Sequence, residues 1–153
     1  MSSEQETAAR LTTLEAELER AIGFHQAGDL EKAAPIYEQI LAQSPTHTDA
    51  LHLLGVAHHQ FGRHEVAADL IGRAIDLSPQ SANFHYNLSR VHIALGHLDR
   101  AAESLRTVRQ LDPHHLDALN DLGNVLAMAG DTQAAVECFL VSISVKNPAS
   151  MLA

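Results

Sequence analysis

The sequence is poor in several residue types, and each shortage narrows the class of protein. The 153 residues contain no tryptophan, one cysteine and only 4% aromatic residues. The single cysteine, Cys138, cannot form an internal disulfide, which favours a reducing compartment and indicates a buried, inert thiol. No apolar run approaches the roughly 20 residues that span a bilayer, and the N-terminal residues lack the pattern of a secretory signal. We therefore expect a cytoplasmic protein of one domain.

Positive charge is also scarce. The chain has 10 lysine and arginine residues against 19 aspartate and glutamate residues, and its formal net charge is −9. Such a chain is not expected to bind nucleic acid or an anionic membrane as its main partner. Four arginines nevertheless lie close together in the sequence, at Arg90, Arg100, Arg106 and Arg109. This basic neighbourhood is suited to an acidic segment of a partner.

Three small or rigid residue types recur at a fixed interval of 34 residues. The glycines are Gly28, Gly62, Gly96 and Gly130, and the alanines are Ala33, Ala67, Ala101 and Ala135. Pro45, Pro79 and Pro113 keep the same interval, and Pro148 comes one residue late. A fixed period of this length is typical of an array of helical repeats.

The apolar pattern predicts two helices in each period and no strand. An apolar stripe at Leu11, Leu14, Leu18 and Ile22 indicates a long first helix, and residues 1 to about 6 are expected to fray. The later helices are predicted near residues 30–43, 48–61, 64–77, 82–95, 98–111, 116–129 and 132–146. Glycine should end the first helix of each pair, and the residue before proline should end the second. Pro35 should bend the second helix.

Small residues also occupy two interior positions of each repeat. In the first helices they are Ala21, Gly55, Ser89 and Gly123, and in the second helices they are the recurring alanines. Small side chains at both positions allow the two helices of a pair to approach closely. Leucine at Gly55 or Ala67 is therefore expected to cost about 1–3 kcal/mol of stability.

Two segments carry a family resemblance. LHLLGVAHHQFGRHEVAADLIGRAIDLSP resembles the tetratricopeptide repeat (TPR) at nearly every characteristic position, and LDALNDLGNVLAMAGDTQAAVECF resembles it almost as closely. The first repeat departs from the pattern, with Arg20 where leucine is expected. The resemblance implies an all-α, right-handed superhelical solenoid of four helix–turn–helix units. The units are expected at 14–47 (degenerate), 48–81, 82–115 and 116–148, with an N-terminal tail and helix start at 1–13 and a truncated or uncapped tail at 149–153.

The resemblance implies a non-catalytic scaffold that binds a peptide or a partner segment. Its concave groove would be lined by the first helix of each pair, at Asp49, His52, Val56, His59, Asn83, Tyr86, Asn87, Arg90, Asn120 and Asn124. The alternative is that these residues form only the solvated face of amphipathic helices. TPR domains that bind chaperones hold a C-terminal carboxylate with groove lysines, but the two lysines here, Lys32 and Lys146, lie on second helices. We expect no such clamp.

No motif of catalysis or cofactor binding is present, so we predict neither an enzyme nor a cofactor. The eleven histidines lack the i, i+4 spacing of helical metal sites, since His52/His59 and His85/His92 are seven residues apart. No metal is therefore predicted. His58 and His92 share a position between the two helices of a pair, where a packed and hydrogen-bonded histidine is expected. A response of the packing to protonation near pH 6 stays open.

The last predicted helix is apolar nearly all round, which is typical of a helix buried on all sides. The residues after Pro148 are too few to form the polar capping helix that a solenoid needs. One explanation, which we prefer, is that the chain is part of a longer protein. The other is a homo-oligomer whose interface comprises Cys138, Leu140, Val141 and Val145. The repeats also resemble bacterial arrays that precede glycosyltransferase, sulfotransferase or methyltransferase domains, so the alternative to a scaffold is the N-terminal module of such a larger bacterial transferase.

Overall fold

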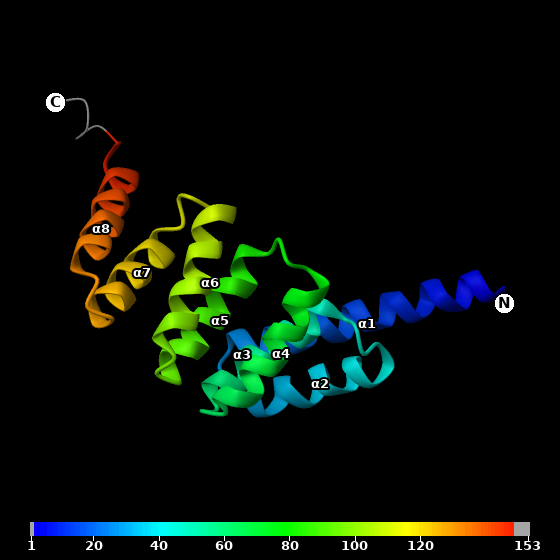
Figure 1. Cartoon of the computed structure of the whole chain (residues 1–153). Helices are drawn as coiled ribbons and strands as arrows, with labels where there is room; N and C mark the ends of the chain where they lie inside the picture. Colours follow the sequence, from blue (N-terminus) through cyan, green and yellow to red (C-terminus); the bar gives the residue numbers. More distant parts are fainter. Residues whose placement is uncertain (1, 149–153) are drawn as a thin grey trace. The chain divides into compact units, whose positions relative to one another are not determined.

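The computed structural model describes residues 2–148, and over that range it contains eight α-helices and no strand. The helices are α1 (Ser3–Gln26), α2 (Leu30–Gln43), α3 (Thr48–Gln60), α4 (His64–Leu77), α5 (Ala82–Ala94), α6 (Leu98–Leu111), α7 (Leu116–Met128) and α8 (Thr132–Lys146) (Figure 1). The predicted bounds of the seven later helices are correct to within one residue. The predicted all-α repeat fold is confirmed, whereas the predicted tail at 149–153 lies outside the described residues.

The helices form two compact units, residues 1–77 with α1 to α4 and residues 78–153 with α5 to α8. Within each unit, successive helices pack against each other, so that α2 lies between α1 and α3, and α6 between α5 and α7. In the second unit, the buried core includes Leu105, Val108, Leu122, Val125 and Cys138. Each unit therefore has its own apolar interior, built from two helix–turn–helix pairs.

The start of α1 corrects the prediction of a frayed N-terminus. The helix begins at Ser3, because Ser2 and Gln5 form a capping box. The Gln5 N–H donates to Ser2 Oγ at 3.4 Å, and the Ser2 N–H donates to Gln5 Oε1 at 3.0 Å. These two bonds satisfy donors that would otherwise be left without partners in the first turn.

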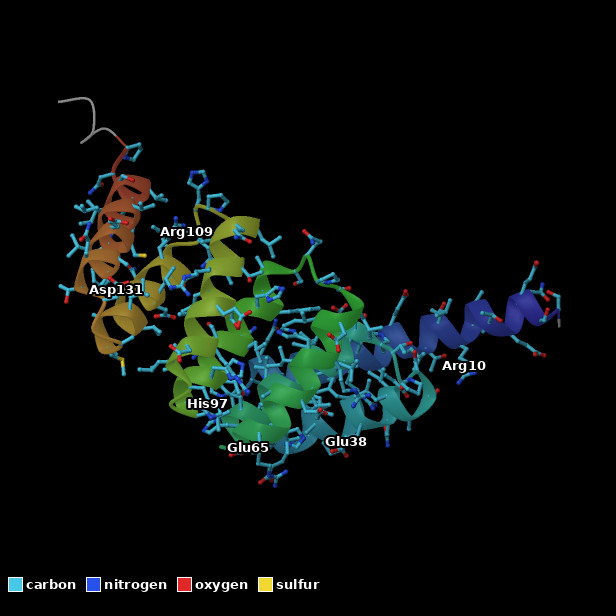
Figure 2. All side chains as sticks on the ribbon, viewed as in Figure 1. Arg10, Glu38, Glu65, His97, Arg109 and Asp131 are labelled. Atoms are coloured by element: carbon cyan, nitrogen blue, oxygen red, sulfur yellow. The ribbon has the colours of Figure 1, made fainter. Side chains whose placement is uncertain are left out.

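The N-terminal half of α1 extends past α2, as Figure 1 shows in blue. Arg10, labelled in Figure 2, donates from Nη2 to the backbone oxygen of Gln43 at 3.0 Å. This bond joins α1 to the end of α2. The extended first helix predicted from the sequence is confirmed.

The turn within each pair has one geometry throughout the chain. All four recurring glycines have positive φ, at 79°, 77°, 73° and 88° for Gly28, Gly62, Gly96 and Gly130. In the second repeat, the Gly62 N–H donates to the His59 oxygen and the Arg63 N–H donates to the His58 oxygen, at 2.9 and 2.8 Å. The other three turns repeat both bonds. These are the bonds of a Schellman motif, which requires a left-handed residue that glycine adopts without strain.

The ends of the second helices also follow the prediction. Helix α2 ends at Gln43, because Ser44 adopts an extended backbone (φ −138°, ψ 85°) before Pro45. Pro35 lies inside α2, which stays helical on both sides of it. The predicted bend at Pro35 stays a prediction.

The interior positions with small residues are where the helices of a pair meet. A Cβ atom built on Gly55 would lie 2.6 Å from Ile71 Cγ1, and one built on Gly123 would lie 2.5 Å from the Phe139 ring. Ser89 fits the same position because its hydroxyl donates to the Tyr86 carbonyl at 2.6 Å. The four alanines of the second helices are at most 2% exposed. Close helix contact is thus the physical reason for both small positions.

Candidate partner-binding surface

The polar surface of the second unit is centred on Tyr86. Its hydroxyl donates a hydrogen bond to Asp121 Oδ2 at 3.1 Å, from α5 to α7. Its ring lies against the His115 ring, with centroids 4.6 Å apart and an angle of 44° between the planes. Tyr86 is half-buried, and its hydroxyl bond to Asp121 joins the first helices of two successive repeats.

The electrostatics around Tyr86 keep its hydroxyl protonated. Burial raises its pKa to about 12, and the charge of Asp121, its hydrogen bond and the charge of Asp117 act in the same direction. The charge of Arg90 opposes them. At neutral pH the tyrosine hydroxyl is therefore protonated and available as a hydrogen-bond donor.

The remaining polar residues flank this link. On α5, the residues Asn83, Tyr86, Asn87 and Arg90 are spaced i, i+3, i+4 and i+7 and so share one face. On α7, the residues Asp117, Asn120, Asp121 and Asn124 have the same spacing. The Tyr86–Asp121 bond shows that these two faces adjoin, and we call these eight residues the α5/α7 surface. It contains all six residues that were predicted here.

Three of its side-chain amides, those of Asn83, Asn87 and Asn120, are hydrogen-bonded within the protein. Asn87 Nδ2 donates to Asn83 Oδ1 at 3.3 Å. Asn120 Oδ1 accepts a bond of 2.8 Å from the Ser142 hydroxyl, which comes from α8. Arg90 and Asn124 are exposed. The surface thus offers a cation, carboxylates and amides around an ordered aromatic ring.

In the first unit the predicted groove residues are arranged differently. Asp49 is exposed, and Val56 and His59 are half-buried. His52 is only 4% exposed and is part of the interior. The prediction that it is an accessible groove residue is therefore wrong. Burial lowers the pKa of His52 to about 4, against the charge of Asp49, while the charge of His25 adds to the lowering.

The first unit also contains a contact between two histidines that the sequence did not predict. His59 Nδ1 lies 3.0 Å from His64 Nδ1, and the ring centroids are 4.8 Å apart. One ring must donate and the other accept, so at least one of these nitrogens is unprotonated. The two residues are five apart, and the Gly62 turn brings them together. Across residues 2–148, no group of three or more acidic, histidine or cysteine side chains is placed to hold a metal ion.

The prediction for His58 and His92 is half right. His92 is buried and His58 is partly buried between the helices of their pairs. However, the Nδ1 atoms of both are buried without a hydrogen-bond partner in the described part of the chain. Burial lowers the pKa of each, and the charges of Arg63 and Arg100 lower the pKa of His58 and His92 respectively. Packing therefore outweighs hydrogen bonding at this position.

The predicted interface residues on α8 differ in their exposure. Cys138 is 1% exposed and belongs to the core of the second unit, so the predicted buried thiol is confirmed and its place in an interface is wrong. Leu140 and Val141 are exposed by 59% and 40%, and Val145 is half-buried. Of the four predicted interface residues, Leu140, Val141 and part of Val145 are therefore open to a partner.

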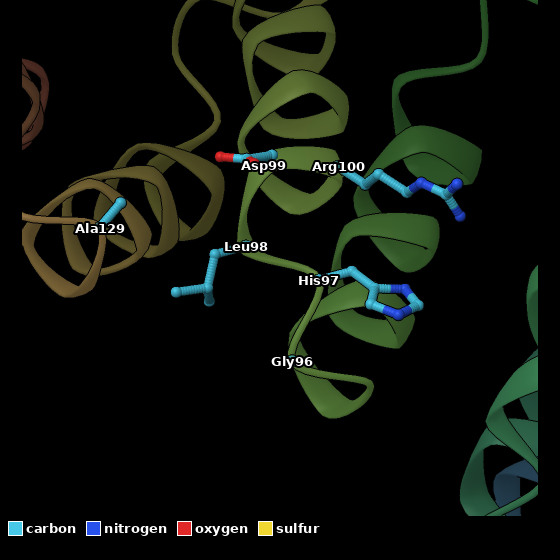
Figure 3. Close-up of a pocket in the computed structure, with 6 residues that line it drawn as sticks. All are labelled: Gly96, His97, Leu98, Asp99, Arg100 and Ala129. Atoms are coloured by element: carbon cyan, nitrogen blue, oxygen red, sulfur yellow. The ribbon is translucent and has the colours of Figure 1, made fainter.

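A hollow of about 660 Å³ lies beside the turn between α5 and α6 (Figure 3). Its lining includes an imidazole, a carboxylate and a guanidinium, from His97, Asp99 and Arg100. Figure 3 shows His97 and Arg100 pointing away from Leu98 and Ala129, so these groups do not converge on one point. The arrangement is not that of an acid–base pair or a nucleophile with its base.

The fold consists of repeated helix pairs, each closed by a glycine turn, and the first helices of two pairs share a polar surface. These features define a helical-repeat scaffold of the kind that binds other proteins. Residues 18–82 and 86–149 match the sequence model of the tetratricopeptide repeat, and residues 59–110 match a second model with that description. The chain belongs to the tetratricopeptide repeat family.

Solved structures with the same fold include several of MamA. One crystal structure of MamA superposes with a TM-score of 0.85 at 21% identity, covering 97% of this chain and 86% of that chain. MamA from Desulfovibrio magneticus RS-1 gives a TM-score of 0.83 at 19% identity, covering 89% of this chain and 77% of that chain. At these identities the likeness establishes the fold.

A third structure is more similar in sequence over a shorter range. It is a mutant of the O-GlcNAc transferase of Thermobaculum terrenum, with a TM-score of 0.73 at 34% identity. The match covers 76% of this chain but 22% of the transferase chain. No protein with a curated description matches the sequence. Among the described residues, no helix is both long and apolar enough to cross a membrane.

Proposed function

We propose that the chain is a non-catalytic, cytoplasmic scaffold that binds a peptide or a partner segment on the α5/α7 surface. The observation that supports this most directly is the Tyr86–Asp121 bond, because it orders the centre of the surface before a partner arrives. Preorganisation lowers the entropic cost of binding. Arg90 and Asn124 lie beside this centre, and because their side chains are exposed they are accessible to a partner.

The residues of the surface indicate what kind of segment it binds. Asp117 and Asp121 accept hydrogen bonds and attract positive charge, Arg90 donates to a carboxylate, and the asparagine amides do both. A segment with backbone groups to satisfy and charges of both signs fits this chemistry better than a purely apolar helix.

The test is selection of binders from a displayed library of random peptides, followed by affinity measurement with the variant Arg90→Ala/Asn124→Ala. We expect selected peptides to bind this variant at least ten-fold more weakly, about 1.4 kcal/mol. The matched control is Arg73→Ala/Gln80→Ala, which removes an exposed arginine and an exposed amide outside the α5/α7 surface and the arginine neighbourhood. Equal affinity for both variants would place the binding site elsewhere.

A second candidate is that the chain is the TPR module of a larger bacterial transferase. The observation that favours it is the 34% identity to the O-GlcNAc transferase, of which this chain covers 22%. In that case the α5/α7 surface recruits the substrate of the catalytic domain. Sequencing the gene through and beyond codon 153 decides between the two, since a catalytic domain in the same frame supports the second. For either candidate we keep the predicted repeat boundaries 14–47, 48–81, 82–115 and 116–148.

A further inference from the structure

The outer side of α8 carries an apolar stripe. Val136, Leu140 and Ile143 are exposed by 48%, 59% and 56%, and their spacing of four and then three residues aligns them along the helix. They lie away from Ala135 and Cys138, which face the core and are at most 2% exposed. Exposed apolar residues in a continuous stripe mark a contact surface more often than scattered ones do.

The repeat period shows which part of this stripe a following repeat would cover. Val136 stands at the position of Ala34 in α2 and Ala102 in α6. Those alanines are 9% and 5% exposed, since α2 packs against α3 and α6 packs against α7. One further first-type helix packed on α8 would therefore cover Val136.

The same comparison shows that a following repeat would leave Leu140 open. Leu140 stands at the position of Glu38 and Arg106, which are exposed although α3 packs beside α2 and α7 packs beside α6. Ile143 stands at the position of Leu41, Ile75 and Arg109, of which the first two are half-buried and only the arginine is exposed. Helix α8 thus has a leucine where the repeat geometry leaves a side chain in water, and a continued array does not account for it.

Charge favours a second copy of the chain as the occupant. Among the residues of α8, only Glu137 and Lys146 are charged, and they cancel, whereas the whole chain carries −9. Two such acidic chains repel each other over most of their surface, so they meet most easily through a neutral element.

The spacing within the stripe is also self-complementary. Val136 and Ile143 lie four and three residues on either side of Leu140. If a second α8 runs antiparallel, Leu140 meets the same residue of the partner, and Val136 meets the partner's Ile143. Alternating steps of four and three residues are those of a coiled-coil contact. A two-fold axis of this kind gives a closed dimer and not an open chain.

We propose that two copies of the chain pair through the outer faces of their α8 helices, antiparallel and related by a two-fold axis at Leu140. This dimer does not depend on the α5/α7 surface. The stripe is short, so the contact area is at the low end for stable complexes and the dimer dissociates on dilution.

The first test is sedimentation velocity of the 153-residue chain over a dilution series. We expect a shift from twice the mass of one chain to a single mass, and the variant Leu140→Glu to be a monomer throughout. The control is Val66→Glu, which changes a valine that is 46% exposed on α4 and should behave as the unchanged protein. Circular dichroism would check that both variants are folded. An unchanged protein that stays monomeric, or a Leu140→Glu dimer, overturns the proposal.

The second test uses the expected two-fold axis. The variant Leu140→Cys should form an intermolecular disulfide under mild oxidation, because the two new thiols face each other. The unchanged chain should not, since its only cysteine, Cys138, is 1% exposed. The control Val66→Cys reports random collisions. If Leu140→Cys is cross-linked no faster than Val66→Cys, the antiparallel pairing is wrong.

Discussion

The hydroxyl of Tyr86 donates to the carboxylate of Asp121 across 3.1 Å, although the two residues are 35 apart in the sequence. The bond joins the first helices of neighbouring repeats, whereas most contacts of the fold join helices that follow one another in the chain. It therefore links the two helices of the α5/α7 surface directly, at the centre of the proposed binding site.

The substitution Tyr86→Phe tests this link. It keeps the ring against His115 and removes the hydroxyl, so we expect the free energy of unfolding to fall by about 1 kcal/mol. Urea denaturation measures the change. Peptides selected on the unchanged protein should also bind more weakly. If stability and affinity both stay the same, the bond neither orders nor stabilises the surface.

The close contact at Gly55 predicts an asymmetry between two helical glycines. Gly55→Leu should destabilise the chain by about 1–3 kcal/mol, because even a Cβ atom would lie 2.6 Å from Ile71 Cγ1. Gly72→Ala is the control: no atom lies within 4 Å of its added Cβ, and alanine favours a helix by about 0.5–1 kcal/mol. Thermal melting should show the two variants moving in opposite directions. A stable Gly55→Leu protein would show that α3 and α4 separate easily.

The buried His52 predicts a loss of stability in acid. Its pKa is about 4 in the fold against 6.5 in the unfolded chain, so between these values only the unfolded chain binds the proton. The free energy of unfolding therefore falls as the pH drops below 6.5, by about 1 kcal/mol at pH 5.5 and on the order of 3 kcal/mol at pH 4. Urea denaturation at pH 7.5 and pH 5.5 measures the difference.

The variant His52→Leu separates this contribution from that of other groups. It should show a smaller loss between the two pH values than the unchanged protein, whereas His114→Gln, an exposed position, should show the same loss. Equal losses in all three proteins would mean that His52 does not control the acid response.

The unpartnered Nδ1 of His92 predicts a stabilising substitution. The fourth repeat has Leu126 at the same position and the first has Phe24, so an apolar side chain fits there. His92→Leu removes a buried polar atom without a partner, and we expect a gain of about 1–3 kcal/mol in the free energy of unfolding at pH 7.5. Calorimetry should show the higher midpoint, with His114→Leu as the exposed control. A destabilised His92→Leu protein would show that the imidazole is satisfied in solution.

The sequence predicts the helices well because their ends are local signals. Glycine at the turn and proline after the second helix act through their own backbone, whatever surrounds them. The prediction for the start of α1 was wrong because the pairing of Ser2 with Gln5 was not recognised as a capping box. Local chemistry therefore accounts for nearly all helix bounds.

The candidate surfaces were predicted less completely, because burial depends on neighbouring helices. The spacing of His52 places it on the groove side of α3, yet it is buried in the first unit. Helix α8 is apolar nearly all round, so its sequence does not show that Cys138 faces the core while Leu140 faces outward. The His59–His64 contact spans a turn and has no helical spacing that would reveal it.

The uniform glycine turns have a consequence for how the chain folds. Because every pair is closed by the same short turn, its two helices meet through residues that are near in the sequence. Little chain entropy is lost in closing such a contact, so folding is fast and does not depend on one obligatory nucleus. Any of the four pairs can form first and serve as the template on which its neighbours order during synthesis.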